Sequence, residues 1–200
     1  MKEIDKDTLI LIVIISEVIL LTIAFFLAII FHIEIHSLII IDLPTTLYAL
    51  VAALILTALN FIVVFILPKF LSVFKPMREA YDEVCHIVAN AQPLSAILIA
   101  ILSGLAEEIL FRGVIQQITG ILIASILFGV LHIYNKKTIF YGLYAIFIGY
   151  YLGLIYIYTQ SLWAPILVHM INNAIAIPFM KRHYKIIKGN QINENTSIID

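Results

Sequence analysis

The sequence predicts an all-α membrane protein, a polytopic bundle of about six transmembrane helices. Of its 200 residues, 62% are hydrophobic and only 12% are charged, and the mean hydropathy is +1.07. Soluble domains carry about 25% charged residues, so this composition excludes an ordinary soluble domain. The net charge of −1 gives no sign of nucleic-acid binding. We therefore expect one integral membrane domain with the lipid bilayer as its partner.

Six apolar stretches predict the spans, because a hydrocarbon core about 30 Å thick needs about 20 helical residues. The stretches are 8–31, 43–67, 93–118, 120–134, 138–158 and 162–180. The fourth is short, and the first is too long for a signal-peptide core, so we expect it to be retained. Between the second and third spans, Met77, Tyr81, Val84 and Val88 recur at helical spacing. This pattern predicts an amphipathic helix on the inner membrane surface.

The basic residues predict the orientation. With the N-terminus inside, eleven of the twelve lysines and arginines fall in cytoplasmic segments, and the twelfth is Arg112 within the third span. The external segments 31–44 and 159–161 contain none. This distribution follows the positive-inside rule, so we expect both termini to be cytoplasmic.

Three ionisable residues interrupt the third span: Glu107, Glu108 and Arg112, in AEEILFRG. One such group at the bilayer centre costs about 2.5–3.5 kcal/mol on insertion scales, so we expect the three to pair and to face a polar cavity. Adjacent helical residues point about 100° apart, whereas residues four apart meet on one face. The spacing predicts a Glu108–Arg112 ion pair, with Glu107 free to face the cavity. Pinning neighbouring helices together is the structural alternative.

Two further polar motifs lie in later spans. FGVLH places Phe128 one turn before His132, and HMINN places His169 one turn before Asn173. A carboxylate can take a proton from water, imidazole can orient that water, and N–H donors can stabilise an oxyanion. We expect no serine to accompany these residues, and Cys85 lies in the linker. Attack by activated water is therefore favoured over a covalent intermediate.

The depth of these groups in the membrane is not settled by the sequence. His132 falls near the cytoplasmic end of a short predicted helix, whereas Glu107 and His169 fall nearer the middle of their spans. A tilted helix or a broken span would bring them to one depth. In either case we expect them to share one cavity.

The three motifs resemble those of the CPBP intramembrane proteases, the CAAX-prenyl-protease and bacteriocin-processing family that is also called Abi. EEILFR resembles the family's E-E-x-x-x-R motif, FGVLH its F-x-x-x-H motif and HMINN its H-x-x-x-N motif. The stretch 149–173 is similar to the family's closing helices, with a G-x-x-x-G at Gly149 and Gly153. The resemblance covers about residues 96–178.

What this resemblance implies is an endopeptidase that cuts a membrane-associated peptide or protein. Glu107 and His132 would activate the water, and His169 and Asn173 would hold the oxyanion. Glu108 and Arg112 would support them. The chain would then divide into two spans with a linker helix (1–92), a catalytic core (93–180) and a polar cytoplasmic tail (181–200). A short chain without a targeting segment suits a bacterial plasma membrane.

Metal dependence stays open. Zinc could bind Glu107, His132 and His169 and leave a fourth position for water, and members of the family are often named metalloproteases on that basis. However, the sequence has no H-E-x-x-H spacing, and the same residues can work without a metal. We favour a site without a cofactor.

Other functions could use the same residues. A non-catalytic immunity protein of the same fold would hold a peptide without cutting it, and a proton-coupled transporter would use the buried carboxylates and histidines as a relay. A haem protein could use His132 and His169 as axial ligands. In the remaining spans, we expect Glu17 to be protonated or bonded to a neighbouring helix, and Asn60 to form an interhelical hydrogen bond.

Overall fold

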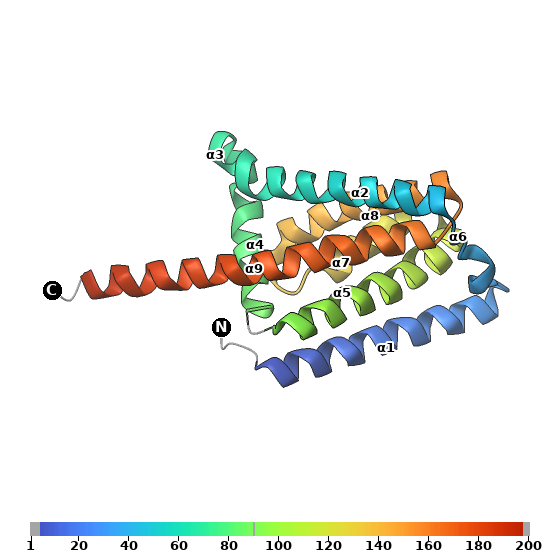
Figure 1. The fold of residues 1–200 in the computed structure, drawn as a ribbon, viewed down its shortest axis with the longest axis horizontal. Helices are drawn as coiled ribbons and strands as arrows, with labels where there is room; N and C mark the ends of the chain where they lie inside the picture. The colour runs from blue at the N-terminus through green and yellow to red at the C-terminus, as the bar shows by residue number, and fades with distance from the viewer. Residues whose placement is uncertain (1–4, 90, 198–200) are drawn as a thin grey trace.

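A computed structural model describes residues 5–89 and 91–197, and all the regular elements in these ranges are helices. The long helices run side by side and form a bundle (Figure 1). In chain order the elements are α1 (Lys6–Ile30), η1 (Ile35–Leu38), α2 (Leu43–Phe61), η2 (Ile62–Ile66), α3 (Leu67–Phe70), η3 (Ser72–Phe74), α4 (Lys75–Ile87), α5 (Pro93–Glu108), η4 (Ile109–Ile115), α6 (Gln116–Thr119), α7 (Ile121–Leu131), η5 (Lys136–Thr138), α8 (Ile139–Thr159) and α9 (Trp163–Ser197). Two of them, η2 and η4, are π-helices.

Five helical segments are long and apolar enough to cross a membrane: Asp7–Ile30, Leu43–Phe70, Pro93–Thr119, Lys136–Thr159 and Trp163–Gly189. They correspond to all the predicted spans except the fourth, so the predicted all-α membrane bundle is confirmed. The fourth is α7, a helix of only 11 residues. In Figure 1, α1 begins and α9 ends at the same end of the bundle, as an even number of crossings requires. The count of six crossings and the cytoplasmic placement of the termini stay predictions.

Aspartate side chains begin the first two long helices. Asp5 caps α1 by accepting from the backbone N–H groups of Asp7 and Thr8 at 3.1 Å each. Asp42 caps α2 by accepting from the Thr45 N–H at 2.7 Å. Both caps satisfy N–H groups that have no partner within the first helical turn, so each helix begins where its aspartate stands.

The predicted amphipathic helix is α4, which lies across one end of the bundle (Figure 1). Met77, Tyr81 and Val84 are buried against the bundle, whereas Glu79 is exposed. The His183 ring on α9 lies 2.8 Å from a carboxylate oxygen of Asp82 on α4. Helix α4 is therefore held to the bundle by an apolar face and by a polar contact.

A helical hairpin brings the third and fourth predicted spans together. α5, η4 and α6 form a continuous segment that ends at Thr119, where Gly120, with a φ of +83°, turns the chain into α7. Glycine adopts a positive φ at little cost. Glu107 precedes Thr119 by twelve residues, and His132 follows Gly120 by twelve. The turn brings both side chains to one level of the bundle, because Glu107 Oε2 and His132 Nε2 are 3.9 Å apart.

The second arm of this hairpin packs closely on α8 at a crossing of two glycines. A methyl group on Gly129 would lie 2.6 Å from the Gly142 carbonyl oxygen, and one on Gly142 would lie 2.8 Å from the Gly129 oxygen. Small residues of this kind allow two helix backbones to approach each other within a membrane. The crossing fixes the position of α7, and therefore of His132, against α8.

The last helix is longer than predicted. α9 contains 35 residues and continues to Ser197, whereas we expected the sixth span to end at residue 180. Pro178 lies inside the helix and does not end it. In Figure 1 the C-terminal part of α9 projects beyond the bundle. The predicted polar tail is therefore helical over residues 181–197, and residues 198–200 lie outside the described residues.

Candidate active site

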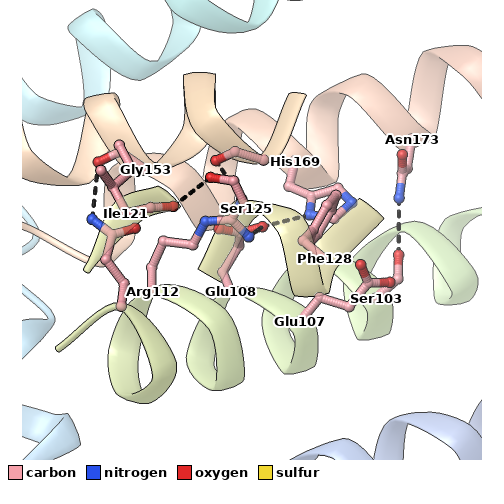
Figure 2. A network of polar contacts seen from close by, with 12 residues as sticks. Ser103, Glu107, Glu108, Arg112, Ile121, Ser125, Phe128, Gly153, His169 and Asn173 are labelled. Carbon is pink, nitrogen blue, oxygen red and sulfur yellow. Dashed lines mark hydrogen bonds and ion pairs between the residues drawn. The ribbon is translucent and has the colours of Figure 1, made fainter. Parts of the chain in front are cut away.

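Glu108, Arg112 and His169 form a buried ionic cluster (Figure 2). Arg112 Nη1 donates to Glu108 Oε1 at 3.0 Å, and His169 Nδ1 donates to the same oxygen at 2.8 Å. The three residues are 0%, 1% and 6% exposed, in the order Glu108, Arg112, His169. Because an ionised carboxylate only accepts, the ring hydrogen is on Nδ1, and Nε2 is left for another partner. The predicted Glu108–Arg112 pair is present, and Glu108 also orients His169, which the spacing alone did not predict.

Two glycine carbonyls on α8 anchor the same segment of the third span. Arg112 Nη2 donates to the Gly149 oxygen at 2.8 Å, and Gln116 Nε2 donates to the Gly153 oxygen at 3.2 Å. Donors and acceptors are each four residues apart, so two helices meet in matching register. A methyl group on Gly153 would lie 2.7 Å from Gln116 Oε1. This glycine pair therefore packs closely, and it leaves backbone oxygens accessible to side-chain donors.

Glu107 faces His132 across a narrow gap. Glu107 Oε2 lies 3.9 Å from His132 Nε2, which is too long for a hydrogen bond. This oxygen is buried and has no hydrogen-bond partner among the described residues. His132 Nδ1 donates to the Phe128 carbonyl oxygen at 2.7 Å, so a neutral ring keeps its lone pair on Nε2. Both atoms that border the gap are therefore acceptors. A water molecule beside them can donate a hydrogen bond to each.

Phe128 packs against three members of the site. Its ring centroid lies 4.6 Å from that of His132 and 5.9 Å from that of His169, and the Arg112 guanidinium carbon lies 4.6 Å from the ring centre. An aromatic face attracts a cation at this distance. The aromatic position of the F-x-x-x-H motif thus holds both imidazoles and the arginine in place. Because Phe128 packs against both rings, the site does not fit a haem between His132 and His169.

Asn173 is held by a serine. Asn173 Nδ2 donates to Ser103 Oγ at 2.9 Å (Figure 2). Our expectation that no serine accompanies the site was wrong, because Ser103 lies on α5 one turn before Glu107 and is 5% exposed. The spacing of four residues was the signal that we missed. Among the described residues, no hydrogen bond joins Ser103 Oγ to a carboxylate or an imidazole, so no base is in place to make it a nucleophile.

Two residues from the N-terminal half also approach the site. Glu17 on α1 is 7% exposed, and its carboxyl group interacts electrostatically with Glu107 and His169. Its buried Oε2 atom has no hydrogen-bond partner among the described residues, so this atom makes no bond to a neighbouring helix there, and the expected protonation of Glu17 stays a prediction. Asn60 Nδ2 donates to Asn172 Oδ1 at 2.7 Å. The interhelical hydrogen bond expected of Asn60 is therefore present.

The described residues hold no group of side chains that could form a metal centre. Within the described residues, no three histidine, cysteine, aspartate or glutamate side chains come together as a metal-binding group. Glu107, His132 and His169 do not have the required arrangement here, and we derive no step through zinc.

The segment that contains the site is similar to known proteins. Residues 89–175 match the family model described as type II CAAX prenyl endopeptidase Rce1-like. The Bacillus subtilis (strain 168) protein named "Uncharacterized protein YpbD" is 38% identical over 80 residues, which are 40% of this chain and 42% of that protein. "Putative membrane peptidase YdiL" of the same organism is 30% identical over 98 residues, which are 45% of this chain and 38% of that protein. No solved structure matches the chain significantly.

These matches confirm the resemblance to the CPBP family that the three motifs predicted. The matched segment contains Glu107, Glu108, Arg112, His132, His169 and Asn173. The aligned parts make up less than half of each curated relative. The comparisons reach no residue before 89 in the family model, so they assign no role to α1 or α2.

Proposed function

We propose that this chain, whose residues 89–175 are similar to type II CAAX prenyl endopeptidases, is a membrane endopeptidase. Glu107 and His132 bind and activate a water molecule, and His169 and Asn173 stabilise the oxyanion. Glu108 and Arg112 hold His169 in position. The proposed location is a bacterial plasma membrane, which agrees with the Bacillus relatives.

The observation that carries this proposal is the gap between Glu107 and His132. A water molecule beside Glu107 Oε2 and His132 Nε2 can donate one hydrogen to each, because both atoms can accept and lie 3.9 Å apart, and Glu107 Oε2 has no hydrogen-bond partner among the described residues. Its oxygen lone pairs then point away from both groups, toward an incoming carbonyl carbon. Both side chains are largely buried, with 14% of Glu107 and 17% of His132 exposed. Burial strengthens such polar contacts, because less water competes for them.

The reaction follows from this arrangement. The water oxygen forms a bond to the peptide carbonyl carbon while Glu107 takes a proton from it. The carbonyl oxygen becomes an oxyanion, and the intermediate collapses by breaking the carbon–nitrogen bond. The leaving nitrogen takes the proton from Glu107, which gives a free amine and a carboxylic acid. His132 orients the water through Nε2 during the attack.

Two donors on α9 are available for the oxyanion. His169 and Asn173 both face α5, because one bonds Glu108 and the other bonds Ser103. When the ring is protonated, His169 Nε2 donates, and Glu108 balances the positive charge from Nδ1. Asn173 Nδ2 carries two hydrogens, of which Ser103 takes one. Each donor of this kind contributes about 2.7–4 kcal/mol to transition-state stabilisation in other hydrolases.

A cavity of about 190 Å³ next to Asn173 suits a membrane-associated peptide. It lies between α2, η2, α4, α8 and α9, and most of its lining is apolar or aromatic. Phe65, Met77 and Phe179 contribute to this lining together with Asn172 and Asn173. An apolar segment of a substrate can bury itself there beside the proposed oxyanion site.

The test compares cells that carry the wild-type protein with cells that carry Glu107→Gln, His169→Ala or the control Glu79→Gln. Glu79 is exposed on α4, outside the proposed site. We expect a membrane-tethered precursor to accumulate in the first two variants and not in the control, as measured by membrane proteomics. The purified wild-type protein should cleave that precursor, and Glu107→Gln should be slower by about 10²–10⁴-fold, the range for a lost general base.

Two other functions predict different outcomes. A peptide-binding immunity protein would keep its biological activity in Glu107→Gln. A proton-coupled transporter would show uptake or efflux that follows a proton gradient, with no precursor. Unimpaired cleavage by Glu107→Gln would overturn the proposed mechanism.

A further inference from the structure

Four hydrogen bonds link five side chains from four helices. Tyr144 OH on α8 donates to Asn60 Oδ1 on α2 at 2.7 Å, and Asn60 Nδ2 donates to Asn172 Oδ1 on α9 at 2.7 Å. Asn172 Nδ2 then donates to Asn173 Oδ1 at 3.3 Å, and Asn173 Nδ2 donates to Ser103 Oγ on α5 at 2.9 Å. Tyr144, Asn60, Asn172 and Asn173 all line the cavity of about 190 Å³.

All four bonds run in one direction, from Tyr144 to Ser103. Each of the three amides accepts on its oxygen and donates from its nitrogen. A hydrogen bond to an amide oxygen draws electron density from the nitrogen and makes its N–H group a stronger donor. Bonds in such a chain strengthen one another by roughly 10–30% each in condensed phase. This chain of hydrogen bonds therefore makes the N–H groups of Asn173 Nδ2 stronger donors. One of these N–H groups is the one proposed to face the oxyanion.

We infer that Tyr144, Asn60 and Asn172 are positioning residues that orient and polarise the Asn173 amide for oxyanion stabilisation. This inference deepens the proposed function and rests on it. It extends the functional site to α2, because Asn60 lies outside the matched segment 89–175. It also gives the Tyr144 hydroxyl a role in addition to lining the cavity proposed for the substrate.

The alternative is that these hydrogen bonds only attach the helices to one another. The protein contains a matched control for this alternative. Tyr151, seven residues after Tyr144 on α8, donates from its hydroxyl to the Ala52 carbonyl oxygen on α2 at 3.0 Å. This bond joins the same two helices but has no connection to the amide chain. Tyr144→Phe and Tyr151→Phe each remove one hydroxyl and one α8–α2 hydrogen bond. Their effects on folding should be alike, and their effects on catalysis should differ.

The experiment uses the full-length protein in liposomes and the precursor identified by membrane proteomics. We expect Tyr144→Phe to lower kcat by about three- to tenfold with an unchanged KM, which corresponds to the net worth of one hydrogen bond. Asn60→Leu, which breaks the next link, should lower kcat at least as much. Tyr151→Phe should keep the wild-type kcat. A wild-type kcat in Tyr144→Phe, or an equal loss in Tyr151→Phe, would overturn the inference.

A double-mutant comparison tests whether the effect passes through Asn173. In single-turnover reactions with excess enzyme, Tyr144→Phe should cause no further loss in an Asn173→Ala background. The same three- to tenfold loss in that background would show that Tyr144 acts by another route, and the inference would fail. The Glu107→Gln variant distinguishes failure of the proposed function from failure of this inference. If it cleaves normally, the proposed function fails and the inference falls with it. If Glu107→Gln is inactive while Tyr144→Phe is normal, only the inference fails.

Discussion

The same substitution should lower the stability of the protein at one of the two adjacent glutamates and leave it nearly unchanged at the other. Glu108 is fully buried and accepts from both Arg112 and His169, at 3.0 and 2.8 Å. Glu108→Gln keeps the size of the side chain but removes its charge. The Arg112 guanidinium, 1% exposed, is then left without its counter-ion. Removing one partner of a buried pair costs about 3–5 kcal/mol, so we expect the free energy of unfolding to fall by that amount.

Glu107→Gln should leave stability nearly unchanged. Glu107 Oε2 has no hydrogen bond to lose among the described residues, and its approach to His132 is 3.9 Å. Large losses of stability come from lost packing, broken charge pairs or broken hydrogen bonds, and Gln keeps the side-chain size, so we expect a change of about 1 kcal/mol or less. The expected contrast is therefore a stable, inactive Glu107→Gln beside a destabilised, inactive Glu108→Gln.

The assay is reversible unfolding in mixed micelles of dodecyl sulfate and a mild detergent, followed by far-ultraviolet circular dichroism. The wild-type protein and both variants are measured under the same conditions, and cleavage of the precursor is measured in parallel. Equal stability losses in the two variants would refute the division of roles between the carboxylates. A fully stable Glu108→Gln would refute the assignment of Glu108 to the ionic cluster.

Four other outcomes are expected. Gly129→Ala should destabilise the protein by about 1–3 kcal/mol through overpacking, because its methyl group would lie 2.6 Å from the Gly142 oxygen. The control Gly189→Ala should not destabilise the protein, because the space around Gly189 is open. Thermal unfolding measures both variants. Burial raises the pKa of the Cys85 thiol to about 12, so at pH 8 about one thiol in ten thousand is ionised; maleimide should leave the folded protein unlabelled by mass spectrometry and label it after denaturation. Ser103→Ala should retain cleavage within about tenfold, the worth of one hydrogen bond, whereas abolished cleavage with normal folding would favour an acyl-enzyme. A strong chelator should leave cleavage intact, and a loss that added zinc restores would contradict the favoured metal-free scheme.

Local sequence patterns predicted much of the fold. The apolar stretches predicted six spans, five of which are helices of spanning length, and the spacing of Met77, Tyr81 and Val84 predicted α4 with its buried face. These predictions succeeded because hydropathy and helical period are properties of neighbouring residues. The continuation of α9 past residue 180 was not predicted, because the apolar stretch ends there and hydropathy marks the span rather than the full length of the helix.

The candidate site was predicted only in part. The contact between Glu108 and Arg112 lies within one turn, so the spacing was sufficient to predict it. The contacts from Glu108 to His169 and from Asn173 to Ser103 join α5 to α9. They depend on how the two helices are rotated and shifted against each other. The spacing of residues within one helix carries no information about that arrangement.

The sequence by itself determined that this chain is a helical membrane protein and which polar residues its spans contain. Hydropathy, charge placement and three short motifs were sufficient, because lipid leaves few alternatives to helices and makes each buried charge costly. The tertiary structure alone decided that His132 lies level with Glu107, with His132 Nε2 3.9 Å from Glu107 Oε2, and that Asn60 from α2 joins the chain of amides ending at Asn173. Such contacts arise from the packing of helices that are distant in the sequence, and packing is fixed by the whole set of interhelical contacts.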